Sequence, residues 1–218
     1  MRLIINSLIA LSLITIMLSS AYAQPPTTLW FDGIPLNDIS ISKDSQYVAA
    51  AESGAPKVRF YSQSGDGTPI WTSTLSEDTL SVAISADGDC VVAGTTSKIY
   101  FWNNARSLSG TPAPTWSSIN LGRIDKRCLD ISDEGDYVAA CGSGESVFYW
   151  ANAKTRSSSS ESFTWNRGFT DSNVECLDLS SDGDYIAAGV DTDVAYWKNA
   201  RSLTGNPAPA WYSTAPGD

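Results

Sequence analysis

The fold is decided by the stretch Cys176-Leu-Asp-Leu-Ser-Ser-Asp-Gly-Asp-Tyr-Ile-Ala-Ala188, because similar stretches begin at Asp38, Ser81 and Cys128. The four starts lie 43, 47 and 48 residues apart, and self-similarity at such a period is the signature of a repeat architecture. An aromatic segment and then a segment with one Trp follow each stretch; these tryptophans are Trp71, Trp116, Trp165 and Trp211. The chain is therefore predicted to hold four related units, at about residues 36–74, 80–118, 127–167 and 175–213.

Each unit has the pattern of four antiparallel strands. Gly88, Gly135 and Gly183 follow an acidic residue at the turn between the first two strands, where a hairpin needs a positive φ. Apolar residues alternate along the first strand, as in Ile39 and Ile41, which places them on one face of a sheet. A four-stranded unit of about 45 residues is typical of a β-propeller blade. We predict an all-β propeller of about four four-stranded antiparallel blades, in an incomplete or open ring.

Composition excludes several functions. The 218 residues include no His, so a Ser-His-Asp triad, a Cys-His pair and histidine metal ligands are absent. The formal net charge of −10 argues against binding to nucleic-acid phosphates, which need a basic surface. No catalytic residue, cofactor or metal site is predicted. The Asp-Gly-Asp turns could offer oxygen ligands to calcium, but their recurrence with the repeat favours plain hairpin turns.

Residues 1–23 have the features of a secretory signal peptide. Arg2 gives a positive start, an apolar run extends to Leu18, and Ala21-Tyr22-Ala23 forms an A-x-A cleavage site before Gln24. An uncleaved N-terminal anchor is the alternative. We expect residues 24–218 to be a secreted or extracytoplasmic repeat domain, at the cell surface or in the periplasm, with no membrane attachment after cleavage.

Two stretches, Val82-Ala-Ile-Ser-Ala-Asp-Gly88 and Val194-Ala-Tyr-Trp197, resemble the WD-repeat and related tandem-propeller families, and the resemblance covers residues 28–213. The Gly-His dipeptide of that family is absent. The Trp of the third strand is followed by Asn103, Ala151 or Lys198, where the family usually has Asp. The resemblance implies a noncatalytic binding platform, although propellers host many unrelated functions.

The number of blades leaves the ring incomplete. Leu29-Trp30 looks like the last strand of a preceding blade, whereas the fourth unit already has its own last strand around Trp211. Three interpretations remain: a fragment of a longer propeller, two chains joined in one ring, or a small four-bladed ring. Open ends expose strand edges, so the expected partner is another protein or a second copy of the chain.

The sequence offers few candidate sites. The resemblance places the first strand of each blade along the central channel, so Asp130 and Asp178 are candidates for ligand binding; alternatively they bond neighbouring backbone N–H groups. Arg106 and Arg201 lie in nearly duplicated loops that could face a partner, or that are alike only through repeat duplication. Export permits a disulfide between Cys128 and Cys141, which flank one predicted hairpin; small buried thiols are the alternative.

Three classes of function remain open. The first is a secreted noncatalytic propeller that acts as a protein- or ligand-binding scaffold. The second is a propeller enzyme, such as a glycosidase, a lyase or a quinoprotein-like dehydrogenase. The third is a structural component of a surface layer. The sequence favours the first.

Overall fold

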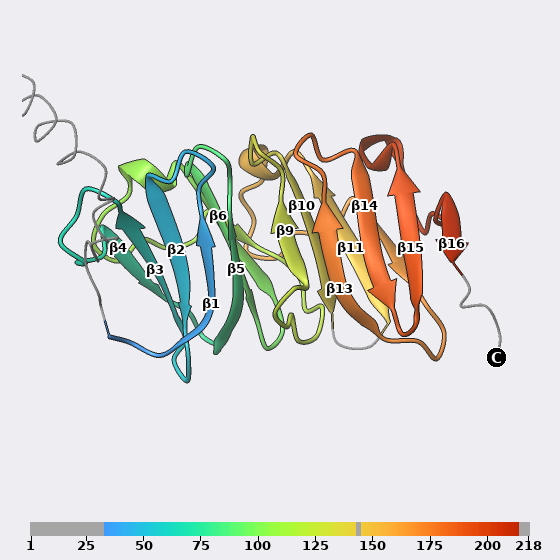
Figure 1. Ribbon diagram of the computed structural model, residues 1–218, viewed down its shortest axis with the longest axis horizontal. Helices are drawn as coiled ribbons and strands as arrows, with labels where there is room; N and C mark the ends of the chain where they lie inside the picture. The colour runs from blue at the N-terminus through green and yellow to red at the C-terminus, as the bar shows by residue number, and fades with distance from the viewer. Residues whose placement is uncertain (1–32, 143–144, 214–218) are drawn as a thin grey trace, which may run out of the picture. The chain divides into compact units, whose positions relative to one another are not determined.

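Each of the four units folds into one antiparallel sheet of four strands (Figure 1). The computed structural model describes residues 33–142 and 145–213. The predicted signal peptide, the Leu29-Trp30 strand and the residues up to 32 lie outside the described part. Within every sheet the strands follow the chain order, so each strand pairs with the next through a hairpin. The prediction of an all-β protein with four four-stranded antiparallel sheets is confirmed.

We call the sheets blades 1 to 4. Blade 1 consists of β1 (Leu36–Ile41), β2 (Tyr47–Glu52), β3 (Lys57–Ser62) and β4 (Trp71–Thr74), and blade 2 of β5 (Thr79–Ile84), β6 (Cys90–Thr95), β7 (Ile99–Asn103) and β8 (Trp116–Ser117). Blade 3 consists of β9 (Leu129–Ile131), β10 (Tyr137–Gly142), β11 (Ser146–Ala151) and β12 (Trp165–Gly168), and blade 4 of β13 (Val174–Leu179), β14 (Tyr185–Val190), β15 (Asp193–Lys198) and β16 (Trp211–Ser213).

The first hairpin of a blade is shaped by its acidic turn. In blade 2, the Asp87 carboxylate accepts hydrogen bonds from the Ser85 hydroxyl at 2.8 Å and from the Asp89 backbone N–H at 2.9 Å. Gly88 follows with φ 76°, a conformation that costs a residue without Cβ little. The Ser-x-Asp-Gly-Asp pattern therefore makes the turn locally.

Successive blades pack face against face. We call the side of a blade that meets the preceding blade its front face, and the opposite side its back face. Trp71, Trp116 and Trp165, on the last strands of blades 1 to 3, are at most 1% exposed on their back faces. Each indole Nε1 donates a hydrogen bond to an alanine carbonyl of the next blade; the acceptors Ala105, Ala153 and Ala200 lie at 2.9, 2.8 and 2.9 Å.

These alanines open three short 3-10 helices, η1 (Ala105–Ser107), η2 (Ala153–Thr155) and η3 (Ala200–Ser202). An Asn in the left-handed conformation precedes each helix, with φ of 54°, 57° and 57° at Asn104, Asn152 and Asn199. Asn tolerates this conformation better than most residues, so the repeated Asn-Ala pair places a carbonyl under each tryptophan.

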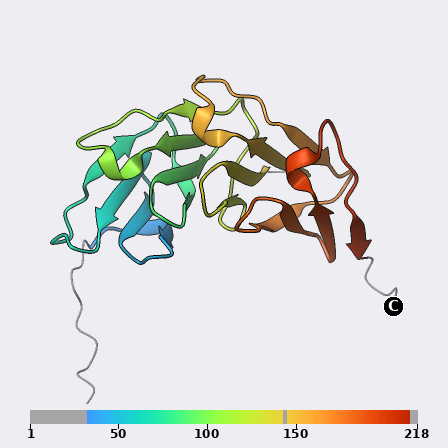
Figure 2. The same ribbon diagram turned by 90° about the horizontal axis from the view of Figure 1, so that it is seen from above.

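The first strands line the inner side of the array. β1 contacts β5, β5 contacts β9, and β9 contacts β13. Seen from above, the four blades of the described residues form an open arc (Figure 2), and no closed ring forms among them. Within the same residues, no helix has the length and apolar character needed to cross a membrane.

Candidate binding surfaces

Asp130 links two blades through its carboxylate. Its Oδ1 accepts a hydrogen bond from the Ile131 backbone N–H at 2.8 Å, and its Oδ2 accepts one from the Leu179 backbone N–H of β13, also at 2.8 Å. Both oxygens thus accept hydrogen bonds from backbone N–H groups. This is the second of the two interpretations that the sequence left open for Asp130. This engagement gives Asp130 a role in holding blade 4 against blade 3.

Asp178 has the matching position on β13 and is exposed. Burial raises the pKa of Asp130 to about 6, and the nearby charge of Asp178 adds to the rise. The two backbone hydrogen bonds act in the opposite direction and lower this pKa. The structure therefore does bring the two candidate carboxyls together. The open arc gives them no enclosed channel within the described residues, and only Asp178 presents its carboxylate to solvent.

Arg106 and Arg201 turn back onto their own blades. The Arg106 Nε lies 3.1 Å from the Asp89 carboxylate, and the Arg201 Nε lies 3.3 Å from that of Asp184. The Arg201 guanidinium also covers the Tyr137 ring of blade 3, at 5.7 Å from its centroid. Both side chains stay about half exposed beside the acidic turns, so a role of these loops in partner binding stays a prediction.

Cys128 and Cys141 form a disulfide with a Cα–Cα distance of 4.7 Å. It ties the residue before β9 to β10, within one blade. Cys90 and Cys176 are free thiols. Burial raises the pKa of the Cys90 thiol to about 12, so this buried side chain is a poor nucleophile.

A hollow of about 520 Å³ opens where the first strands of the blades begin. We call it the mouth hollow; its lining consists of Asn37, Leu80, Arg123, Asp125, Lys126, Arg127 and Glu175. All four blades contribute, because Asn37 lies on β1, Leu80 on β5, Arg127 before β9 and Glu175 on β13. This hollow was not predicted from the sequence, although Arg123-Ile-Asp-Lys-Arg127 is a dense charged run. Only the fold brings the distant members together.

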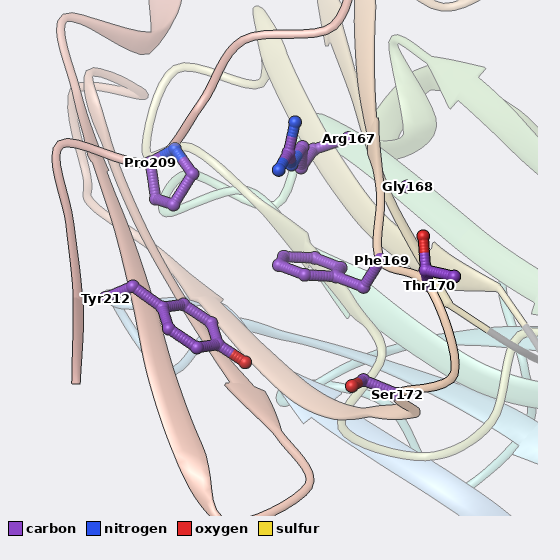
Figure 3. A pocket seen from close by; sticks show the side chains of 7 residues that line it. All are labelled: Arg167, Gly168, Phe169, Thr170, Ser172, Pro209 and Tyr212. Atoms are coloured by element: carbon purple, nitrogen blue, oxygen red, sulfur yellow. The ribbon is translucent and has the colours of Figure 1, made fainter. Parts of the chain in front are cut away.

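A second hollow, of about 330 Å³, lies between the outer strands β12 and β16 (Figure 3). The Arg167 guanidinium lies 5.7 Å from the centroid of the Phe169 ring, and this ring stacks on Tyr212 with 6.2 Å between centroids. Its lining is completed by Gly168, Thr170, Ser172 and Pro209. The Phe169 and Tyr212 rings belong to the contacts that pack blade 4 on blade 3.

The acidic turns show no metal-binding geometry. Hydrogen bonds from the Ser180 hydroxyl and the Asp184 backbone N–H lower the pKa of Asp182, so its carboxylate serves the turn. In the described part of the chain, no three Asp, Glu, Cys or His side chains gather as a metal site would require.

Comparison with known proteins supports the architecture. Residues 161–198 match the family model "WD domain, G-beta repeat", and no curated protein matches the chain. Because 1343 chains of solved structures match, the fold by itself does not indicate one function.

One solved structure, "Complex of KlAtg21 with coiled-coil of AgAtg16", has a TM-score of 0.63 and 12% sequence identity over 81% of this chain. This chain spans 57% of the length of its counterpart there. The likeness shows the fold alone. Together, the repeat match and the shared fold support a WD-repeat type of β-propeller, which is what this chain resembles.

Proposed function

We propose that the chain is an exported, noncatalytic propeller module that binds another protein or a second copy of itself. The WD-repeat match supports a role as a protein-interaction scaffold, and the similar solved structure is a complex with a coiled coil. The engagement of both Asp130 oxygens by backbone N–H groups argues against that carboxyl as a general acid.

The observation that carries this proposal is the mouth hollow. Lys126, Arg127 and Glu175 are exposed there and form no ion pair within the described residues. Side chains of both signs around an open hollow suit a protein segment that carries both signs itself, because complementary charges give specificity and speed association.

Capture from the extracytoplasmic fraction of the native source tests the scaffold role. The chain with Lys126→Glu and Arg127→Glu should lose a partner that the unaltered chain retains. Lys198→Glu with Lys57→Glu makes the same change in charge at positions outside the hollow, and should retain the partner. Equal retention by both variants would refute the mouth hollow as the binding surface.

Export is tested separately by the intact mass of the protein recovered outside the cytoplasm. The A-x-A site leads us to expect a mature chain that begins at Gln24. A mass that includes residues 1–23 would contradict the signal peptide. Screening the purified chain for glycosidase, lyase and quinone-dependent dehydrogenase activity tests the enzymatic alternative.

A further inference from the structure

Three contacts recur at each junction between blades. The tryptophan of the last strand bonds an alanine carbonyl of the next blade, as described above. A backbone N–H at the first turn of each blade also donates to the turn of the next: Lys43 to Ala86, Ala86 to Asp133, and Asp133 to Ser181, at 2.9, 3.0 and 2.8 Å. The third contact is apolar, between the back face of one blade and the first strand of the next.

Among the described residues, no blade packs on the back face of blade 4. Trp211 stacks on Tyr196 at 5.2 Å, as Trp165 stacks on Tyr149 at 5.2 Å, so the aromatic pair is built in the same way. Yet Trp211 is 51% exposed where Trp165 is 0% exposed. Val194 is 40% exposed, whereas its counterpart Val147 is fully buried.

Blade 1 presents the complementary front face. Ile39 and Ile41 on β1 are each 60% exposed. The residues at the same repeat positions in the other blades are between 4% and 9% exposed: Val82, Ile84, Leu129, Ile131, Leu177 and Leu179. Tyr61, on the outer part of this front face, is buried at 3%, so the exposed apolar surface is on β1.

Polar groups at the two faces also correspond. Asp178 repeats the position of Asp130, whose Oδ2 accepts the Leu179 N–H of the following blade. The group of blade 1 that corresponds to Leu179 N–H is the backbone N–H of Ile41. At the turns, the Ser181 N–H of blade 4 corresponds to the Asp133 N–H, which donates to the next blade. The Lys43 carbonyl of blade 1 corresponds to the Ser181 carbonyl, which accepts from the preceding blade.

We propose that the back face of blade 4 docks onto the front face of blade 1 of a second copy, head to tail, with Asp178 accepting the Ile41 N–H of that copy. This deepens the proposed function and rests on it, since it names the partner at the open blade ends. A second copy fits because one chain carries both halves of the turn-to-turn and apolar contacts that it already makes three times internally. Blade 1 has no 3-10 helix after β3, so the Trp211 indole contributes mainly by apolar burial in this contact.

Such a contact is heterologous, because different surfaces of the two copies meet. Heterologous contacts close into rings or continue as chains, according to the rotation between copies. Burial of Trp211 and of the two isoleucines supplies the central apolar residues that carry most of the affinity in typical interfaces.

Sedimentation velocity of the full mature chain over a range of concentrations tests the proposal. The unaltered chain should associate more as concentration rises. Trp211→Ala and Ile41→Glu should each raise the dissociation constant at least about tenfold. Both side chains are exposed in the single chain, so neither change should prevent folding, which circular dichroism checks. Tyr212→Ala is the matched control: this residue is 37% exposed on the same strand but stacks on Phe169, and it should not change association.

Mixing the two variants separates head-to-tail from back-to-back docking. The Trp211→Ala chain keeps an intact front face and the Ile41→Glu chain an intact back face, so an equimolar mixture should regain association that neither variant shows alone. Association by Ile41→Glu alone at the level of the unaltered chain would overturn the proposal. A monomer at every concentration would overturn it too. A monomeric chain could still bind a partner at the mouth hollow, because the Lys126→Glu and Arg127→Glu capture experiment tests that surface separately.

Discussion

At the scale of single residues, a tryptophan at one repeat position has two different environments. Trp71, Trp116 and Trp165 are buried and donate their indole N–H to an alanine carbonyl of the next blade. Trp211 occupies the same place in blade 4 and is 51% exposed. Its stability contribution is therefore set by the neighbouring blade and not by the residue type.

Trp116→Phe should lower the free energy of unfolding by about 1–3 kcal/mol, because it leaves the Ala153 carbonyl with only the longer 3.4 Å bond from the Arg156 N–H and opens a small cavity. The same change at Trp211 should stay within about 0.5 kcal/mol, the range of ordinary surface substitutions. Urea unfolding of the monomeric chain measures both, and equal losses would contradict the role of the indole bond.

Asp130→Asn should flatten the pH dependence of stability. Burial and the charge of Asp178 raise the pKa of Asp130 to about 6, so the folded chain holds this proton above the pH at which the unfolded chain releases it. Its contribution is full below pH about 4 and falls as pH rises to about 6, by on the order of 2–3 kcal/mol. Urea unfolding at several pH values should show this fall in the unaltered chain relative to Asp130→Asn. Parallel curves would refute it.

At the scale of elements, each blade is held by links that differ along the chain. Blade 3 has the disulfide between Cys128 and Cys141, which ties the entry of β9 to β10. In blades 2 and 4, an arginine of the 3-10 helix forms an ion pair with an aspartate of the acidic turn in the same blade. These pairs are exposed, so each contributes at most about 1 kcal/mol, whereas the disulfide constrains the unfolded chain more strongly.

Replacing both cysteines, Cys128→Ser with Cys141→Ser, should destabilise the chain by about 2–4 kcal/mol. Alkylation of the unfolded, unreduced chain should modify only Cys90 and Cys176, as read by mass spectrometry. Modification of all four cysteines without a reductant would show that the disulfide is absent. In the folded chain Cys90 should react slowly, because it is buried and its thiol pKa is raised to about 12.

At the scale of the whole molecule, the four blades form a linear array in which blades 2 and 3 each pack against two neighbours. Arrays of this kind derive their stability from each repeat and from the junctions with adjacent repeats. Blade 4 has one such junction among the described residues, and its back face meets solvent.

Hydrogen exchange of the monomeric chain should follow this order. Amides of β6, β7, β10 and β11 should be the most protected, and those of β14, β15 and β16 should exchange earlier, because the last blade can open without disrupting the others. Head-to-tail association should raise protection in blade 4 specifically. Uniform protection across all blades of the monomer would indicate that the array unfolds only as one unit.

The sequence by itself determined the strands, the turns and the repeat. Alternation in the first strands, the acidic turn with its glycine, and the recurring Trp act within one unit, so they can be read without the fold. It also placed Cys128 and Cys141 beside one hairpin, which is again a local relation.

Only the tertiary structure decided which repeated residues are buried, and against what. Arg106 and Arg201 lie in loops far in sequence from the acidic turns, and the fold places them beside Asp89 and Asp184. Asn37, Leu80, Arg127 and Glu175 are far apart in sequence and share one hollow because the first strands of all blades begin there. Trp211 and Ile41 match their buried counterparts in sequence and differ from them in exposure. The physical reason is that a repeat fixes the shape of each face locally, whereas burial depends on which blade stands next to it.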